Sequence, residues 1–117
     1  MKSPQRGQVF LLKADSEGKK RPVLIVSPIN LNAGNAVSAV PFYSQNTAER
    51  RKKPYCVFFE QGECGLDKDC VAKTDEVSRY RLNEFDSPFK PLGEATTAKM
   101  QEISQALCYS LGIHFQP

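Results

Sequence analysis

The chain has 117 residues, enough for one domain whose modest hydrophobic core would bury roughly two-thirds of the surface that the unfolded chain exposes. Sixteen Lys and Arg stand against thirteen Asp and Glu, and the formal net charge of +3 is too small to diagnose a nucleic-acid-binding protein by itself. No apolar run approaches the roughly 20 residues of a membrane-spanning helix, and the N-terminus lacks the apolar core of a signal peptide. We therefore expect a cytoplasmic protein that forms one domain over residues 1–117 and does not contact a membrane.

Four short strands are predicted in the first half of the chain, separated by turn residues. A run of branched aliphatics, VLIV, follows Pro22, and a proline suits the first position of a strand because it has no backbone N–H. The third predicted strand contains Pro41, which for the same reason indicates a sheet edge or a bulge near its end. The predicted strands span residues 7–14, 22–28, 36–43 and 55–60.

The connections are polar and rich in turn residues. Residues 44–54, SQNTAERRKKP, are predicted to form a long basic loop between the third and fourth strands. Two glycines mark the segment 61–69 as a turn that leads into CVAKTDEV, and a short strand or a turn of helix is expected over residues 78–85.

A helical pattern appears only near the C-terminus. Thr96 or Thr97 can cap a helix there, and Gly112 is a suitable C-terminal stop. Several antiparallel strands followed by one amphipathic helix predict a mainly β protein of the α+β class, a small curved antiparallel β-barrel with the helix packed against it. Apolar residues recur along the helix at steps of three and four and are expected in the core: Met100, Ile103, Leu107 and Leu111.

The four cysteines favour structural thiols over a metal site. They are irregularly spaced, without a Cys-x-x-Cys pair, and His114 is the one histidine that could join them. In a cytoplasmic chain such cysteines are expected to be reduced. We therefore expect neither a metal ion nor a cofactor. The cysteines are Cys56, Cys64, Cys70 and Cys108.

Positive charge is concentrated between residues 13 and 53, where eight Lys and Arg face three acidic residues. This local excess suits a polyanion, although solvated loops have the same composition. Arg21 precedes the strand that begins at Pro22, so its guanidinium is either a positioned anion binder or a solubilising charge at a sheet edge.

Five segments, taken in order, resemble the MazF/PemK (Kid-like) family of toxin–antitoxin endoribonucleases across nearly the whole chain. Each segment is weak evidence alone, and their order and spacing make the match specific. The resemblance implies a homodimeric SH3-like barrel that cleaves single-stranded RNA without a metal ion and is silenced by a cognate antitoxin. The segments are RGQVFLL, KRPVLIVSP, AVPFYSQ, GLDKDCVAKTDEVSRYRL and MQEISQALCYSLGI.

The resemblance implies roles for three charged residues. Arg21 matches the arginine of the family's Arg-Pro strand start, which is proposed to act on the scissile phosphate, and this match favours the anion-binding alternative. Asp75 matches a proposed general base, which would take the proton from a ribose 2′-hydroxyl. Lys73 stands where PemK-type members carry an arginine, so the charge is kept but the bidentate fork is lost. A charged strand and turn at the surface is the alternative interpretation of residues 73–81.

The chain also departs from the family pattern. Tyr43 replaces a threonine whose hydroxyl contacts the cleaved phosphate, while Ser44 is matched and keeps a small hydroxyl nearby. Tyr43 with Ser44 is therefore predicted to orient the phosphate, and an aromatic residue that closes the barrel rim is the alternative. Glu76 stands in place of a glutamine, and Arg79 is displaced by one position because Ser78 occupies the family's arginine site.

The resemblance places the basic loop near the RNA groove, where its cations would supply sequence-independent affinity. Tyr43 and Tyr55 are expected to stack on unpaired bases. The predicted RNA-binding residues are Lys19, Lys20, Gln45, Arg50, Arg51, Lys52, Lys53, Glu76 and Arg79.

Three functions remain open at this point. The leading hypothesis is a toxin that cleaves mRNA, with a cognate antitoxin as partner. The second is a catalytically impaired relative that binds RNA or an antitoxin, which would bind RNA without cutting it. The third is a protein-targeting toxin like the related gyrase inhibitors, for which the tail HFQP gives no support and which a supercoiling assay would detect.

Overall fold

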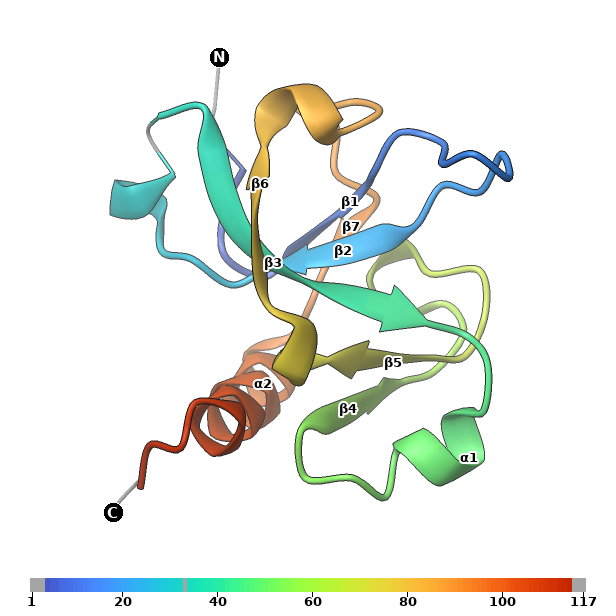
Figure 1. The fold of residues 1–117 in the computed structure, drawn as a ribbon, viewed down its shortest axis with the longest axis vertical. Coiled ribbons are helices and arrows are strands. Elements are labelled where there is room, and N and C mark those ends of the chain that lie inside the picture. Colours follow the sequence, from blue (N-terminus) through green and yellow to red (C-terminus); the bar gives the residue numbers. More distant parts are fainter. Residues whose placement is uncertain (1–3, 33, 115–117) are drawn as a thin grey trace.

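A computed structural model describes residues 4–32 and 34–114. They form a seven-stranded antiparallel sheet that curls into a half-barrel, with the order β4-β5-β3-β2-β1-β7 and with β6 paired to β3 beside this path (Figure 1). This arrangement confirms the predicted mainly β class. The strands are β1 (Gln8–Leu11), β2 (Pro22–Ile25), β3 (Ala36–Tyr43), β4 (Cys56–Phe59), β5 (Cys70–Lys73), β6 (Ser78–Arg81) and β7 (Gly93–Glu94).

β3 curls the sheet because it changes partner along its length. Its first half pairs with β6 and its end, Phe42 and Tyr43, pairs with β5, while β2 lies along its other edge. Pro41 was predicted to mark a sheet edge or a bulge, and the edge alternative is wrong because β3 lies inside the sheet. The proline is tolerated because it falls between the β6 and β5 pairings, where the registers leave it no ladder partner on that edge.

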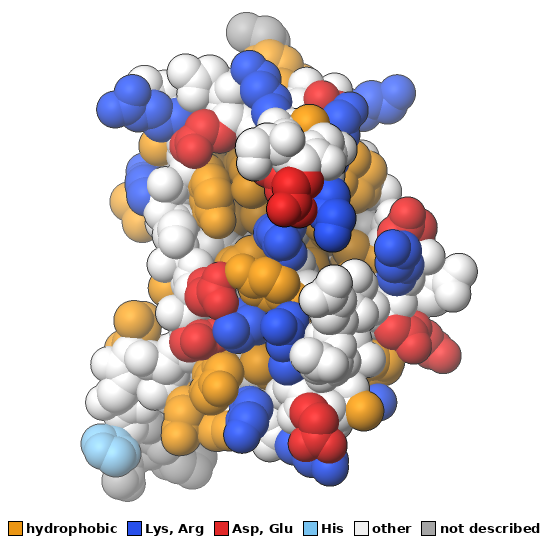
Figure 2. Space-filling view, turned by 45° about the vertical axis from the view of Figure 1, so that its right-hand side comes forward, with side chains coloured by type: hydrophobic (Ala, Val, Ile, Leu, Met, Phe, Trp, Pro, Cys, Tyr) orange, Lys and Arg blue, Asp and Glu red, His pale blue; other side chains and the backbone are white. Residues whose placement is uncertain are grey.

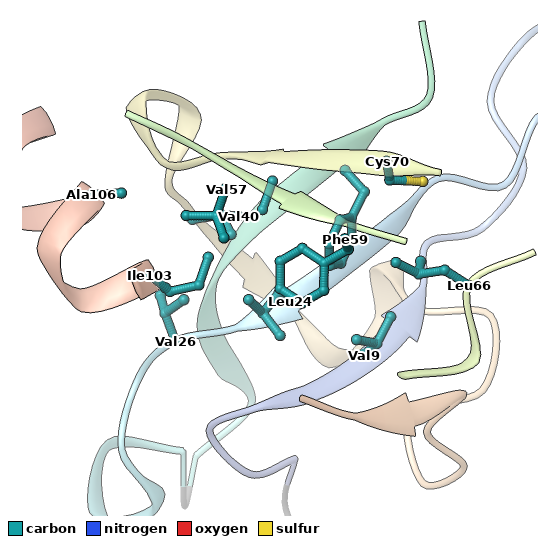
Figure 3. Packing of buried hydrophobic residues seen from close by; sticks show 12 residues of the cluster. Val9, Leu24, Val26, Val40, Val57, Phe59, Leu66, Cys70, Ile103 and Ala106 are labelled. Atoms are coloured by element: carbon teal, nitrogen blue, oxygen red, sulfur yellow. The ribbon is translucent and has the colours of Figure 1, made fainter. Parts of the chain in front are cut away.

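The alternation of side chains along the strands gives the sheet an apolar cluster on each face. Leu24 and Phe59 lie in the larger cluster, and Ile103 and Ala106 of the C-terminal helix join this cluster from one side (Figure 3). The residues that alternate with these point the other way, and the second cluster is closed by stacked Phe10 and Phe85 rings whose centroids are 5.5 Å apart. Apolar side chains are therefore buried on both faces of the sheet. A functional site is then expected at the ends of the strands.

The predicted C-terminal helix is confirmed as α2 (Thr97–Ser110). The hydroxyl of Thr96 caps it by accepting from the backbone N–H of Lys99, at 3.2 Å. Gly112, with φ +69°, ends it because that left-handed conformation suits glycine. The prediction that Leu111 belongs to the core is wrong: it is 61% exposed because it lies beyond the last turn.

Several short elements were not predicted, and two of them bear on the site and on the sheet. A single turn of helix, α1 (Thr47–Arg50), lies within the stretch expected to be a basic loop. β7 pairs with β1, and Gly93 is required there because a Cβ at this position would lie 2.4 Å from the backbone carbon of Cys64. The segment 78–85 holds both predicted alternatives, strand β6 and then a turn of 3-10 helix at Leu82–Glu84.

Candidate functional site

The start of β2 and the end of β3 bring Arg21 and Tyr43 together. Val23 pairs with Pro41, so continuing this antiparallel register by two residues places Arg21 opposite Tyr43. Nη1 of Arg21 donates to the backbone carbonyl of Phe42 at 3.0 Å, and its Cζ lies 4.2 Å from the centroid of the Tyr43 ring. The guanidinium is therefore held by one hydrogen bond and by a cation–π contact.

The 3-10 turn Thr74–Glu76, directly after β5, supplies the acidic side of the site. Tyr43 donates its phenolic hydrogen to Oε1 of Glu76. Nζ of Lys73 donates to Oε2 of Glu76 at 2.8 Å and lies 3.9 Å from Oδ2 of Asp75. We call Tyr43, Arg21, Arg50, Lys73 and Glu76 the Tyr43 cluster, since the guanidinium of Arg50 also lies over the ring, 4.9 Å from its centroid.

The contacts within the cluster fix the charge of its members. Burial, and then the hydrogen bond to Glu76, raises the pKa of Tyr43 above its ordinary value. The same carboxylate raises the pKa of Lys73 by accepting its hydrogen bond. Burial opposes ionisation of Glu76, but the hydrogen bonds from Lys73 and Tyr43 outweigh it and lower the pKa of Glu76. At neutral pH the phenol is therefore protonated between a cationic Lys73 and an anionic Glu76.

This charge arrangement predicts how stability depends on pH. Because the folded-state pKa of Glu76 lies below the ordinary value of 4.5, its stabilising contribution is fully present above pH 4.5 and is lost as the pH falls through the folded value. As the pH falls below 4.5, we expect the melting temperature of the wild-type chain to decrease more than that of the Glu76→Gln variant. Parallel curves for the two proteins across the acid range would contradict the predicted contribution of Glu76.

Two cavities, each of about 460 Å³, lie beside the Tyr43 cluster. Figure 2 shows this face of the molecule, where Lys and Arg side chains gather around a central hydrophobic side chain. The first cavity is lined by Lys19, Lys20, Arg21, Pro22, Phe42, Tyr43, Ser44, Gln45, Arg50, Asp67, Lys68 and Cys70. The second is lined by Asn46, Glu49, Arg50, Lys53, Tyr55, Cys56 and Lys73.

Comparison with known proteins identifies the family. Residues 5–111 match the family described as the PemK-like, MazF-like toxin of type II toxin–antitoxin systems. The chain belongs to this toxin family. The resemblance that the sequence carried, and the curled antiparallel fold that it implied, are thereby confirmed.

Individual relatives of the toxin cover almost its whole length. It is 27% identical over 117 residues to the endoribonuclease MazF of Staphylococcus saprophyticus, a match that covers 94% of this chain and 92% of that protein. A mycobacterial endoribonuclease, solved in complex with its cognate antitoxin, superposes with a TM-score of 0.78 at 29% identity, over 97% of this chain and 100% of that one. The MazE–MazF complex of Deinococcus radiodurans shares the fold, with a TM-score of 0.72 at 22% identity, over 97% and 100% of the two chains.

The structure of the toxin gathers most of the predicted site residues. Arg21, Lys73 and Glu76 each contact Tyr43, and Asp75 joins them through Lys73. The other predicted residues that line one of the two cavities are Lys19, Lys20, Ser44, Gln45, Arg50 and Lys53.

Four predicted RNA-binding residues of the toxin line neither cavity, and one of them, Glu76, belongs to the Tyr43 cluster. The guanidinium of Arg51 lies over the Phe58 ring, 3.8 Å from its centroid. Lys52 pairs with Glu49 at 3.5 Å. Arg79 donates to the hydroxyl of Ser38 at 3.2 Å and to the backbone carbonyl of Leu31 at 3.3 Å, so the structure does not bring it to the Tyr43 cluster.

Sequence reasoning missed Asp67 and Lys68, which line the first cavity of the toxin. The signal that could have found them is strand pairing. β5 begins directly after this turn and pairs with the end of β3, where Tyr43 stands opposite Val71. A charged turn that enters a strand beside a site residue is itself close to the site.

No group of three or more His, Cys, Asp and Glu side chains lies close enough to hold a metal ion among residues 4–32 and 34–114. All four cysteines of the toxin are free thiols, and Cys56 and Cys70 are buried. Within the same residues, no helix is both long enough and apolar enough to cross a membrane.

Proposed function

We propose that the Tyr43 cluster is the centre at which this toxin of a type II toxin–antitoxin system cleaves single-stranded RNA as an endoribonuclease. The observation that carries the proposal is that Arg21 and Lys73 lie over one ring, with Asp75 paired to Lys73, beside a cavity whose charged lining residues are five cations and one carboxylate. A polyanionic substrate suits this cavity because Asp67 is the one acidic residue among those that line it. The relatives named endoribonuclease support the same activity.

In the proposed reaction Asp75 takes the proton from a ribose 2′-hydroxyl, and the 2′-oxygen attacks the adjacent phosphorus. The bond from phosphorus to the 5′-oxygen of the next nucleotide breaks, and that oxygen takes up a proton from water. The products are a 2′,3′-cyclic phosphate and a 5′-hydroxyl. Arg21 stabilises the charge that develops on the phosphoryl oxygens, and Lys73 holds Asp75 in place through their 3.9 Å ion pair.

Tyr43 and Ser44 have different parts in this proposal. The phenolic hydrogen of Tyr43 is donated to Glu76, so the ring, rather than the hydroxyl, faces the cations of the site. Ser44 lines the first cavity and offers the small hydroxyl that can donate to a phosphate oxygen. Lys19, Lys20 and Gln45 line the same cavity and would guide the RNA backbone.

The proposal extends to partners and location. The mycobacterial relative was solved with its cognate antitoxin, and we infer that this chain likewise binds an antitoxin whose acidic segment fits the cationic cavities. We further propose that residues 1–117 act as one domain, that the toxin works as a homodimer, and that it acts in the cytoplasm, where mRNA is available.

The test is incubation of the purified toxin with a long unstructured RNA in EDTA, followed by chemical analysis of the fragment ends. We expect discrete fragments with 2′,3′-cyclic phosphate and 5′-hydroxyl ends. Binding of the RNA without cleavage by the folded protein would contradict the enzymatic proposal and would identify the chain as a binding relative.

A further inference from the structure

Two arginines from distant parts of the chain share one aromatic ring. Arg21 precedes β2 and Arg50 ends α1, yet their Cζ atoms lie 4.2 and 4.9 Å from the centroid of the Tyr43 ring. Both residues line the first cavity. The adjacent Arg51 instead lies over Phe58, so contact with Tyr43 is particular to Arg50 and is not shared by the whole basic turn.

The two guanidinium groups keep most of their donors uncommitted. Arg21 donates once, from Nη1 to the carbonyl of Phe42. The side chain of Arg50 makes no hydrogen bond or ion pair with the described residues, and its Nη1 is buried without a partner among them. A guanidinium carries five donors, and leaving them unpaired away from water is unfavourable. The ring offsets part of this cost through cation–π attraction, and an anion in the cavity would supply the missing acceptors.

The surroundings of the first cavity select the class of that anion. Lys19, Lys20 and Lys68 line it together with the two arginines, and Asp67 is its one acidic lining residue. Phosphate oxygens accept parallel hydrogen bonds from a guanidinium, and a polymer that carries many phosphates suits several cations along one cavity.

We propose that Arg50 is a second phosphate-binding residue of the cleavage site, which acts with Arg21 on the RNA backbone, and that the Tyr43 ring positions both guanidinium groups. This inference rests on the proposed endoribonuclease function. In this proposal Arg50 contacts a specific phosphate of the RNA instead of only attracting the polyanion. Tyr43 acts through its ring, which positions the two guanidinium groups. Arg50 can thereby donate two parallel hydrogen bonds to a phosphate, which the ammonium group of Lys73 cannot do.

The experiment compares single-turnover cleavage at saturating RNA for Arg50→Gln, Arg50→Lys and the control Arg81→Gln. Arg81 is an exposed arginine of β6 that lines neither cavity, so its variant loses the same charge away from the site. We expect Arg50→Gln to lower the rate about 100-fold, as removal of one transition-state donor does, and Arg50→Lys to restore little of it. Equal saturating rates for Arg50→Gln and Arg81→Gln would overturn the proposal.

Tyr43 variants test the positioning role. Tyr43→Phe keeps the ring and should lose less than about tenfold in rate, while Tyr43→Leu should lose about as much as Arg50→Gln. In Tyr43→Leu, the further change Arg50→Gln should then cost little, because both substitutions disrupt the same contact. Loss of activity in Tyr43→Phe equal to that in Tyr43→Leu would show that the hydroxyl, and not the ring, is required.

A binding measurement separates this inference from the proposed function. The probe is a single-stranded oligonucleotide with 2′-deoxyribose throughout, which cannot be cleaved by attack of a 2′-hydroxyl. Arg50→Gln should weaken its binding and reduce the slope of log affinity against log salt by about 0.7, the value of one phosphate contact on a single strand. If the wild-type chain leaves RNA intact, the proposed function fails, and an unchanged slope in Arg50→Gln would then also refute the phosphate contact.

Discussion

Arg21→Ala is expected to lower the rate of RNA cleavage at least about 10³-fold while leaving the protein folded, since an arginine that stabilises a phosphoryl transition state contributes on this scale. The side chain is only partly buried and precedes β2, so its removal opens no core cavity. Single-turnover cleavage at saturating RNA, with circular dichroism to check the fold, measures the effect. Arg21→Lys should recover little activity because an ammonium cannot donate two parallel hydrogen bonds.

Arg81→Ala is the matched control for Arg21→Ala. Arg81 is exposed on β6 and lines neither cavity, so its loss changes the net charge of the chain equally. We expect the cleavage rate of this variant to stay close to that of the wild-type chain. Full cleavage by a folded Arg21→Ala protein would remove Arg21 from the mechanism.

The fold was predictable wherever local sequence and tertiary structure agree. β3 has the predicted bounds because its β-branched and aromatic residues are flanked by turn residues, and α2 begins at the predicted Thr96 cap. β7 escaped prediction because two residues carry no periodicity, and its pairing with β1 depends on a close approach to Cys64 that only Gly93 permits. Such an approach depends on distant residues and leaves no local pattern.

The residues of the candidate site could be proposed from the sequence, but their contacts could not. Arg21 and Tyr43 were placed in the site by the family resemblance, and the register between β2 and β3 accounts for their proximity. The resemblance predicted that Tyr43 with Ser44 orients the phosphate, and it gave no sign that the Tyr43 hydroxyl donates to Glu76, 33 residues away in the chain. Side-chain torsions and long-range charge pairing decide this contact. Arg50 reaches the same ring from α1, a single helical turn where the sequence predicts a loop.

Asp75→Asn is expected to lower the single-turnover cleavage rate by about 10² to 10⁴-fold, the usual contribution of a positioned general base, without weakening RNA binding. The side chain is 39% exposed and its Oδ2 lies 3.9 Å from Nζ of Lys73, so the amide fits the same space and the fold is retained. Removal of a negative charge beside a cationic cavity should leave affinity for an uncleavable oligonucleotide unchanged or higher. The combination of a lost rate and retained binding distinguishes a base from a residue that only holds the substrate.

Asp69→Asn is the matched control, because it also replaces one carboxylate by an amide near β5. Oδ1 of Asp69 accepts from the backbone N–H of Gln61 at 2.8 Å, a hydrogen bond that an asparagine retains, and Asp69 lines neither cavity. We expect this variant to cleave RNA at nearly the wild-type rate. If Asp75→Asn cleaves as fast as Asp69→Asn, Asp75 is not the base. Glu76 would then be an alternative carboxylate, although the hydrogen bonds from Tyr43 and Lys73 lower its pKa and so oppose proton uptake.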